Sequence, residues 1–251
     1  RDYVATLIEL VGRKGVTPDA AKTLIRTNST VIAAIAVMRG DADAMIAGLE
    51  GRFNSKLRNI RDIIGLKPGV RDLSAMTLMI TSKGHYFLAD THVKHDPDAD
   101  DIADIALLCA GHVERFGIAP KIALLSHSDF GDSDAASAVK MRRALDIIRT
   151  RAPHLHVDGE MQGDTALVQA IRAKRLPDCK LDGDANILIM PNLDAANIAQ
   201  QLIKVLADAL PVGPILLGTA KPAHVLTTSV TARGVVNMTA LAVVEAQANG
   251  G

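Results

Sequence analysis

The sequence has few aromatic residues and no excess of charge, and each shortage argues against a class of partner. Aromatic residues make up 2% of the 251 residues and tryptophan is absent, so the chain offers no ring platform for single-stranded nucleic acid. Lysine plus arginine equals aspartate plus glutamate, at 28 each. A neutral chain lacks the general charge attraction that draws proteins to nucleic acid or to a membrane surface. We therefore expect neither partner.

Cysteines and long apolar runs are also scarce. Cys109 and Cys179 lie far apart in the sequence, and Cys109 falls in an apolar helical pattern that is typical of a small core residue. This usage favours a reducing cytoplasm. No apolar run is long enough to cross a bilayer, and no signal-peptide pattern is present. The chain starts at Arg1, without methionine and within a helical pattern, so we expect a fragment of a longer cytoplasmic protein.

What the sequence does contain is hydrophobic periodicity that alternates between helix and strand. Hydrophobic residues make up 48% of the chain, and aliphatic side chains suit helices packed on a sheet. The pattern predicts helices over 1–14, from 18, and over 30–38, 51–65, 98–116, 135–149, 165–173 and 193–206, and one after Thr231. It predicts strands over 44–48, 76–80, 86–89, 121–125, from 157, and over 186–190 and 214–217. Such alternation predicts a doubly wound α/β fold with right-handed crossovers.

The segment 213–247 holds the strongest candidate site. An apolar run over 214–217 is followed by Lys221 and a group of hydroxyl residues, and Thr231 can cap the closing helix. A loop that leaves a strand and enters a helix is where anionic ligands bind in α/β proteins, because free N–H groups and the helix dipole face them. An ordinary polar connection is the alternative.

Two further segments could bind an anion. The stretch 51–65 is a basic helix start after an expected strand and carries Arg52, Lys56, Arg58 and Arg61, although a solvated helix face would look the same. The loop 126–133 ends one strand and opens a helix, and Ser126 and Ser128 could contact a phosphate. This loop lacks both the Gly-Lys-Ser/Thr ending of a P-loop and a dinucleotide fingerprint.

Two acidic segments invite other chemistry. His92 and His95, with the aspartates of 96–101, could bind zinc or manganese, but Pro97 and the capping pattern favour a surface linker, so we expect no metal. Asp158, Glu160 and Asp164 could serve as general acids or bases. Hydrogen bonding to loop amides is the interpretation that we favour for them.

The segments KMRRALDIIRTRAPHLHVDGEMQGDTAL, MPNLDAANIAQQLIK and GPILLGTAKPAHVLTTSVTARGVVNMTALAVVEAQ resemble the phosphate acetyl/butyryltransferase family. They are most similar to the form fused behind the catalytic part of bacterial NAD(P)-dependent malic enzymes. The resemblance implies two doubly wound open-sheet subdomains around a cleft, as in isocitrate and isopropylmalate dehydrogenases. It also implies one subdomain over 1–92 plus 227–251, incomplete at its amino end, and another over 93–226.

The residues that match the family's site depart from its catalytic pattern in two places, the closing loop and the segment before Arg58. Active members carry a Ser-Arg pair and then an Asp, where this chain has Thr227, Thr228 and Gly234. A threonine cannot neutralise a phosphate and glycine cannot act as a base, so we expect no catalytic residue. By position, the family's cleft arginine matches Arg58, but Gly51, Arg52 and Phe53 replace the short His/Ser/Thr run that usually precedes it.

The resemblance implies a regulatory domain that binds acetyl-CoA as an allosteric effector and forms homodimers within a larger homo-oligomer. The expected ligand contacts are Arg58, Ser126, Ser128, Lys221, Thr227, Thr228 and Ser229. The catalytic domain of a malic enzyme, in the same chain, would oxidise malate to pyruvate with NAD or NADP and a divalent metal; this segment itself is expected to hold no cofactor. Alternatives are an active acyltransferase, a purely structural oligomerisation module and, more distantly, a dehydrogenase of related fold.

Overall fold

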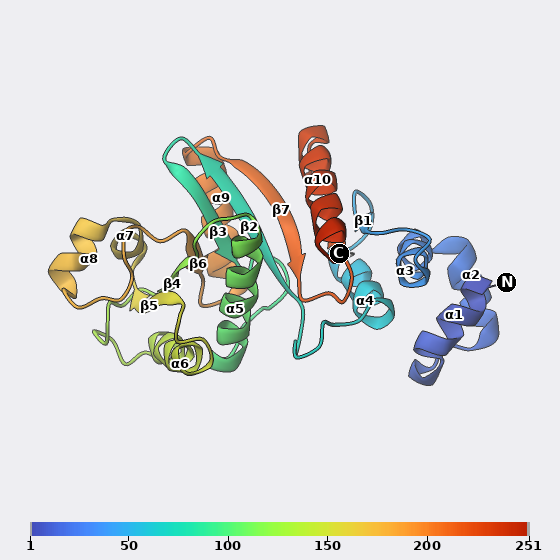
Figure 1. Cartoon of the computed structure of the whole chain (residues 1–251), viewed down its shortest axis with the longest axis horizontal. Coiled ribbons are helices and arrows are strands. Elements are labelled where there is room, and N and C mark those ends of the chain that lie inside the picture. The colour runs from blue at the N-terminus through green and yellow to red at the C-terminus, as the bar shows by residue number, and fades with distance from the viewer. Residues whose placement is uncertain (1, 250–251) are drawn as a thin grey trace. The chain divides into compact units, whose positions relative to one another are not determined.

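The computed structural model describes residues 2–249 and divides the chain into two compact units (Figure 1). The first unit comprises Arg1–Leu73 and Gly213–Gly251, and the second comprises Ser74–Val212. The sequence placed the boundaries later, at 92/93 and 226/227. Strand pairing explains the difference: residues 74–89 form a hairpin that pairs within the second unit, whereas residues 223–225 pair with strand β1 of the first.

The first unit begins with three helices, α1 (Asp2–Val11), α2 (Pro18–Thr27) and α3 (Ser29–Arg39). Thr17 caps α2 by accepting from the backbone N–H of Ala20, and Pro18 occupies the first helical turn, where its missing N–H costs nothing. Asn28 caps α3 in the same way, and Gly40 ends α3 in the left-handed conformation. Short polar caps therefore set these boundaries. Arg1, in the expected first helix, lies outside the described residues.

The rest of the first unit is a small parallel sheet with helices against it. Strand β1 (Met45–Ala47) pairs in parallel with β8 (Ala223–Val225). Helix α4 (Phe53–Ile63) follows β1, and α10 (Ala232–Asn249) follows β8. Helices α3 and α10 contact β1, and α4 and α10 contact β8. Leu57, Ile60 and Ile63 form the buried face of α4.

The second unit is built on a mixed sheet in the order β5-β4-β6-β3-β2-β7. Its strands are β2 (Ser74–Thr81), β3 (Gly84–Ala89), β4 (Lys121–Leu125), β5 (His156–Met161) and β6 (Ile187–Ile189). Strand β7 (Leu210–Leu217) begins in this unit and ends in the first. Strands β5, β4, β6 and β3 run parallel, and the hairpin partner β2 is antiparallel to β3.

Helices connect these strands, as parallel pairing requires. They are α5 (Ala99–Arg115), α6 (Ala136–Arg151), α7 (Gly163–Leu167), α8 (Gln169–Arg175) and α9 (Leu193–Leu206). Asp98 and Asp101 form a reciprocal capping box at the start of α5. The core is aliphatic, as the composition predicted, with Met79, Leu88 and Leu188 among its buried side chains.

The predicted alternation is confirmed in nearly every element, and the differences are local. The helix expected over 165–173 is divided into α7 and α8 at Val168. Strand β7 starts four residues before the expected run at Pro214. The polar connection expected after Leu217 contains the fully buried strand β8, so that interpretation was wrong for Ala223–Val225.

Candidate anion-binding site

Two loops of the first unit meet at the carboxyl ends of the β1–β8 sheet. Residues 48–52 follow β1 and residues 226–231 follow β8. The backbone N–H of Leu226 donates to the carbonyl oxygen of Ala47 at 2.7 Å, which extends the pairing to the point where the loops begin. Helices α4 and α10 start directly after these loops. Because the strands are parallel, both helix amino ends open at the same edge of the sheet.

Close packing of the two loops depends on Gly48. A Cβ at this position would lie 2.5 Å from the carbonyl oxygen and 2.9 Å from the Cβ of Leu226, and the φ angle of Gly48 is +143°. The next residue, Leu49, has a φ of +68° and is 57% exposed. A branched side chain in that conformation is strained, and strained residues gather at ligand-binding loops. The loop after β1 therefore has a strained backbone of the kind that is common in ligand-binding loops.

Helix α4 begins without the features that usually neutralise a helix start. Its N-cap residue, Arg52, makes no side-chain cap, and its first turn has no acidic residue. A Cβ on Gly51 would lie 3.9 Å from Nζ of Lys56, so the Lys56 ammonium reaches back toward the helix start. The helix dipole and the Lys56 ammonium thus place positive charge at this helix end, and Arg52 adds a cation at the N-cap position. Such an end attracts an anion.

Arg58 lies one turn further along α4 and is exposed. No hydrogen bond or ion pair joins its guanidinium to another of residues 2–249. Its neighbours on the helix, Leu57 and Ile60, are buried. The predicted arginine is thus a solvent-facing cation on the helix that starts at this edge of the sheet.

The loop after β8 carries hydroxyl groups and starts α10. The hydroxyls of Thr227 and Ser229 lie 3.1 Å apart, and Thr228 is exposed. The Thr231 hydroxyl accepts from the N–H of Gly234 at 3.1 Å, which confirms its predicted role as a helix cap. Helix α10 has no acidic residue in its first turn. This loop offers hydrogen-bond donors next to a second positive helix end.

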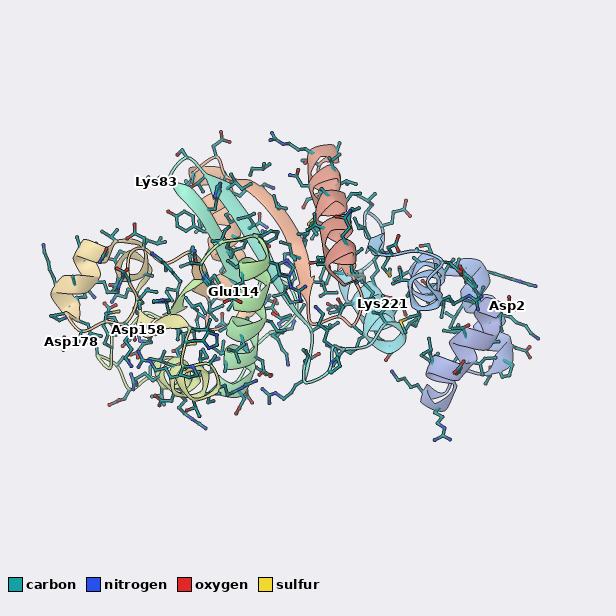
Figure 2. All side chains as sticks on the ribbon, in the orientation of Figure 1. Asp2, Lys83, Glu114, Asp158, Asp178 and Lys221 are labelled. Atoms are coloured by element: carbon teal, nitrogen blue, oxygen red, sulfur yellow. The ribbon has the colours of Figure 1, made fainter. Side chains whose placement is uncertain are left out.

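Lys221 is separated from these hydroxyls by the whole of β8. Lys221, labelled in Figure 2, lies in the turn before the strand. Thr227 and Thr228 follow the strand. The preceding residue, Ala220, donates to the carbonyl oxygen of Gly65, just beyond the end of α4. Lys221 therefore stands at the amino end of the β1–β8 sheet, opposite the two loops. The sequence grouped these residues because it showed no strand between them.

His224, in the middle of β8, is fully buried and structural. Its Nδ1 accepts from the N–H of Leu216 at 3.2 Å, and its Nε2 lies 3.1 Å from a carboxylate oxygen of Glu245. Acceptance at Nδ1 places the ring proton on Nε2, where it is donated to Glu245. The histidine thereby links β7, β8 and α10 within the first unit.

The serines of the loop 126–133 belong to the second unit, and their side chains are engaged in internal bonds. Ser128 is 1% exposed and donates its hydroxyl to Glu160 at 2.7 Å. The Ser126 hydroxyl accepts from the N–H of Ser128 at 3.3 Å. The N–H of Gly131 also donates to Glu160, at 3.0 Å. A ligand at this loop would have to displace or share these bonds.

The three carboxylates considered for acid–base chemistry have structural partners. Glu160 is fully buried and pairs with Arg142 at 2.8 Å, and Asp158 pairs with Arg149 at 2.9 Å. Asp158 also accepts from the backbone N–H groups of Gly159 and Lys180. Asp164 accepts from the N–H of Thr165. Hydrogen bonding to loop amides, the interpretation favoured from the sequence, is confirmed.

The segment with His92 and His95 forms a polar turn after β3 around the buried carboxylate of Asp90, and His95 itself is exposed. Asp90 accepts from Ser74 and from the backbone N–H groups of His92, Val93 and Lys94. Burial raises the pKa of Asp90 in spite of those bonds, and burial lowers the pKa of His92 to about 4. Within residues 2–249, no three His, Cys, Asp or Glu side chains gather in a way that could hold a metal ion.

The two cysteines show no sign of reactivity. Cys109 is buried and free, and burial raises the pKa of its thiol, with Asp90 adding to the effect. Burial also raises the pKa of Cys179 to about 11. A nucleophilic cysteine needs a lowered pKa, so neither thiol is a candidate nucleophile.

Comparison with known proteins assigns the chain to a family. Residues 1–243 match phosphate acetyl/butaryl transferase. The chain belongs to that family. The transferase-family fold is confirmed by a phosphotransacetylase from Streptococcus pyogenes, whose structure superposes with a TM-score of 0.89 at 32% identity, over 100% of this chain and 76% of that one. The expected α/β class and family resemblance are therefore both confirmed.

The sequence relatives of the chain include larger enzymes. The chain is 54% identical over 245 residues to an NAD-dependent malic enzyme of Rhizobium meliloti. The match covers 98% of this chain and 32% of the enzyme. It is 34% identical to a phosphate acetyltransferase of Acetivibrio thermocellus, over 98% of this chain and 76% of the relative. The chain thus spans about a third of the length of the malic enzymes that it matches.

The sequence indicated a basic helix start with Arg52 and Lys56, but the expected ligand contacts included only Arg58 from that stretch. The structure has Arg52 at the N-cap of α4 and the Lys56 ammonium near Gly51, at a helix start without a side-chain cap. The available signal was the absence of any Ser, Thr, Asp or Glu at 51–53, where a helix normally has a capping residue.

Within residues 2–249, no helix combines the length and the apolar character that are needed to cross a bilayer.

Proposed function

We propose that the chain is the regulatory, phosphotransacetylase-like domain of a malic enzyme and that its first unit binds acetyl-CoA. The observation that carries the ligand proposal is the uncapped start of α4, where Arg52 and Lys56 add two cations to a positive helix end. The similarity to malic enzymes over 98% of this chain supports the parent. Acetyl-CoA suits the site because its phosphates are anionic and its thioester carbonyl accepts hydrogen bonds.

The ligand groups divide between the two loops by their chemistry. The phosphates belong with the α4 start and Arg58, where free N–H groups and cations can neutralise them. The hydroxyls of Thr227, Thr228 and Ser229 can donate to the carbonyl oxygen of the acetyl group. Lys221 stands at the other end of the sheet, so its contact would require the extended tail of the ligand. Ser126 and Ser128 are secondary candidates, because both already form internal bonds.

Binding without turnover follows from the residues of the closing loop. Where the family's active members carry an arginine and an aspartate, this chain has Thr228 and Gly234, and Gly234 is buried with its N–H bonded to Thr231. Loss of one charged donor to a developing negative charge typically costs about 3–4 kcal/mol of transition-state stabilisation. An active phosphate acetyltransferase is the second candidate function, favoured by the 34% identity to such an enzyme.

In the proposed parent, the catalytic domain in the same chain oxidises malate to pyruvate with NAD or NADP and a divalent metal, in the cytoplasm. The phosphotransacetylase-like domain contributes self-association into dimers within a larger homo-oligomer. Acetyl-CoA regulates that reaction only to the extent that it binds two states of the enzyme with different affinity.

Calorimetric titration with acetyl-CoA tests the function. We expect saturable binding, and we expect Arg58→Ala to weaken it roughly 10- to 100-fold, because a charge-assisted hydrogen bond contributes about 1.5–3 kcal/mol. Arg26→Ala is the matched control, since Arg26 is an exposed arginine on α2 of the same unit. Unchanged affinity in Arg58→Ala would remove Arg58 from the site.

A second titration with inorganic phosphate in the cell separates the alternatives. A sensor gives the same saturable curve with no further heat. Continuous reaction heat, with acetyl phosphate formed, would mean that the chain is an active transferase. No heat in either titration would favour a purely structural oligomerisation module.

A further inference from the structure

A valine and a glycine pack against each other where the loop after β8 enters α10. Val230 and Gly234 are four residues apart, and Gly234 is buried in the first turn of the helix. A Cβ built on Gly234 would lie 2.7 Å from Cγ2 of Val230 and 3.5 Å from the Thr231 hydroxyl oxygen. Carbon atoms that are not bonded to each other pack at about 3.5–4.0 Å. The Val230 side chain therefore occupies space that any larger residue at position 234 would need.

Helix geometry alone does not call for a glycine at position 234. Its φ angle lies outside the left-handed range in which glycine is favoured. Inside a helix, glycine is also less favourable than alanine, because it loses more conformational freedom on folding. What glycine does allow here is the close packing of Val230, whose half-buried side chain rests against the bare α-carbon. Val230 and Gly234 are therefore matched to each other in size.

Val230 belongs to the same turn as the hydroxyl groups of this loop. Its backbone N–H donates to the carbonyl oxygen of Thr227 at 3.2 Å, which closes a turn over residues 227–230. The hydroxyls of Thr227 and Ser229 lie 3.1 Å apart in that turn, and Thr228 is exposed. Valine is β-branched, so its side chain has little rotational freedom. The turn thus presents a rigid apolar side chain directly beside three hydroxyl groups.

We propose that Val230 limits the acyl group of the bound ligand to acetyl. The inference rests on the proposed function, in which the hydroxyls of residues 227–229 donate to the thioester carbonyl oxygen. The acyl chain begins at the carbon that carries this oxygen, so the next side chain of the same turn borders it. An acetyl methyl fits beside Val230, whereas a butyryl chain has two further methylenes that need the space of the valine. Membership of a family named for both acetyl and butyryl transfer leaves the acyl length open.

Calorimetric titration of the full-length protein with three ligands tests the proposal. Coenzyme A has no acyl group and reports on binding of the phosphates alone, and acetyl-CoA and butyryl-CoA add the two acyl lengths. We expect butyryl-CoA to bind at least about 10-fold more weakly than acetyl-CoA, because apolar sites discriminate one methylene by roughly 10- to 200-fold. Val230→Ala removes two carbon atoms, as many as butyryl adds. It should bring butyryl-CoA to within about 3-fold of acetyl-CoA and leave the affinity for coenzyme A unchanged.

Val236→Ala is the matched control, since Val236 is 66% exposed on the same helix and lies outside the turn. It should keep the preference for acetyl-CoA. Equal binding of acetyl-CoA and butyryl-CoA to the unsubstituted protein would overturn the proposal, and so would a preference that Val230→Ala leaves unchanged. In either case acetyl-CoA still binds, so the proposed function stands. If neither coenzyme A nor either thioester binds, the proposed function fails and the role of Val230 fails with it.

The contact with Gly234 gives a second test in the opposite direction. Gly234→Ala places a Cβ against Cγ2 of Val230 and displaces that side chain toward the acyl group. Acetyl-CoA should then bind about 10-fold more weakly, whereas coenzyme A should bind as before, which also shows that the variant is folded. In the double variant with Val230→Ala the Cγ2 atom is gone, so the affinity for acetyl-CoA should recover to within about 3-fold. A double variant that stays as weak as Gly234→Ala would contradict the role of Val230.

Discussion

Replacement of Gly48 by alanine should destabilise the first unit more than an ordinary glycine substitution does. The added Cβ would lie 2.5 Å from the carbonyl oxygen of Leu226 and 2.9 Å from its backbone N, and the φ angle of +143° is one that L-residues rarely adopt. Backbone strain of this kind costs about 1–3 kcal/mol. Forcing paired backbone segments apart adds a further cost of about 1–3 kcal/mol. We therefore expect a loss of about 2–6 kcal/mol.

Gly40→Ala is the matched control for this prediction. Gly40 ends α3 with a φ of +79°, but nothing lies within 4 Å of a Cβ built there. It should cost only the left-handed strain, about 1 kcal/mol. The difference between the two variants isolates the close approach of the loops after β1 and β8.

The assay is urea denaturation followed by hydrogen exchange of peptides from each unit. Peptides of the first unit should unfold at much lower urea in Gly48→Ala, whereas peptides from β4 and β5 should keep their midpoint. If Gly48→Ala were no more destabilising than Gly40→Ala, the packing of the loop after β1 against Leu226 would not be what fixes this edge of the sheet.

Two other substitutions test the second unit. Burial lowers the pKa of His92 to about 4 from 6.5, so the unfolded chain binds more protons between those values and stability rises with pH there. From pH 7 down to pH 5, the contribution of His92 to the free energy of unfolding falls by about 2 kcal/mol. His92→Gln should lose that part of the pH dependence in denaturation curves. An unchanged profile of stability against pH would show that the imidazole is hydrated. Arg172 is 1% exposed and donates to the carbonyl oxygens of Thr165, Ala166, Leu181 and Gly183. Arg172→Leu should therefore cost about 3 kcal/mol or more in thermal unfolding, whereas Lys174→Leu, at an exposed position of the same helix, should cost little.

Most secondary structure could be predicted because its signals are local. The strand β4 and the helix α9 begin and end at the predicted residues. Asp98 and Thr231 act as caps, as their positions before apolar periodic runs indicated. Periodicity and capping involve residues within a few positions of each other, so the sequence alone carries them. The family resemblance likewise rested on contiguous sequence segments.

The tertiary structure decided which of these residues meet. Strand β8 has three residues and forms because β1, distant in sequence, pairs with it; without that pairing the segment looked like a loop. That strand puts Lys221 and Thr228 at opposite ends of the sheet, although they are only seven positions apart in the sequence. Pairing across 29 to 32 positions likewise occupies Ser128 and Gly131 with Glu160. Contacts between distant segments depend on strand order and register, which no local pattern specifies.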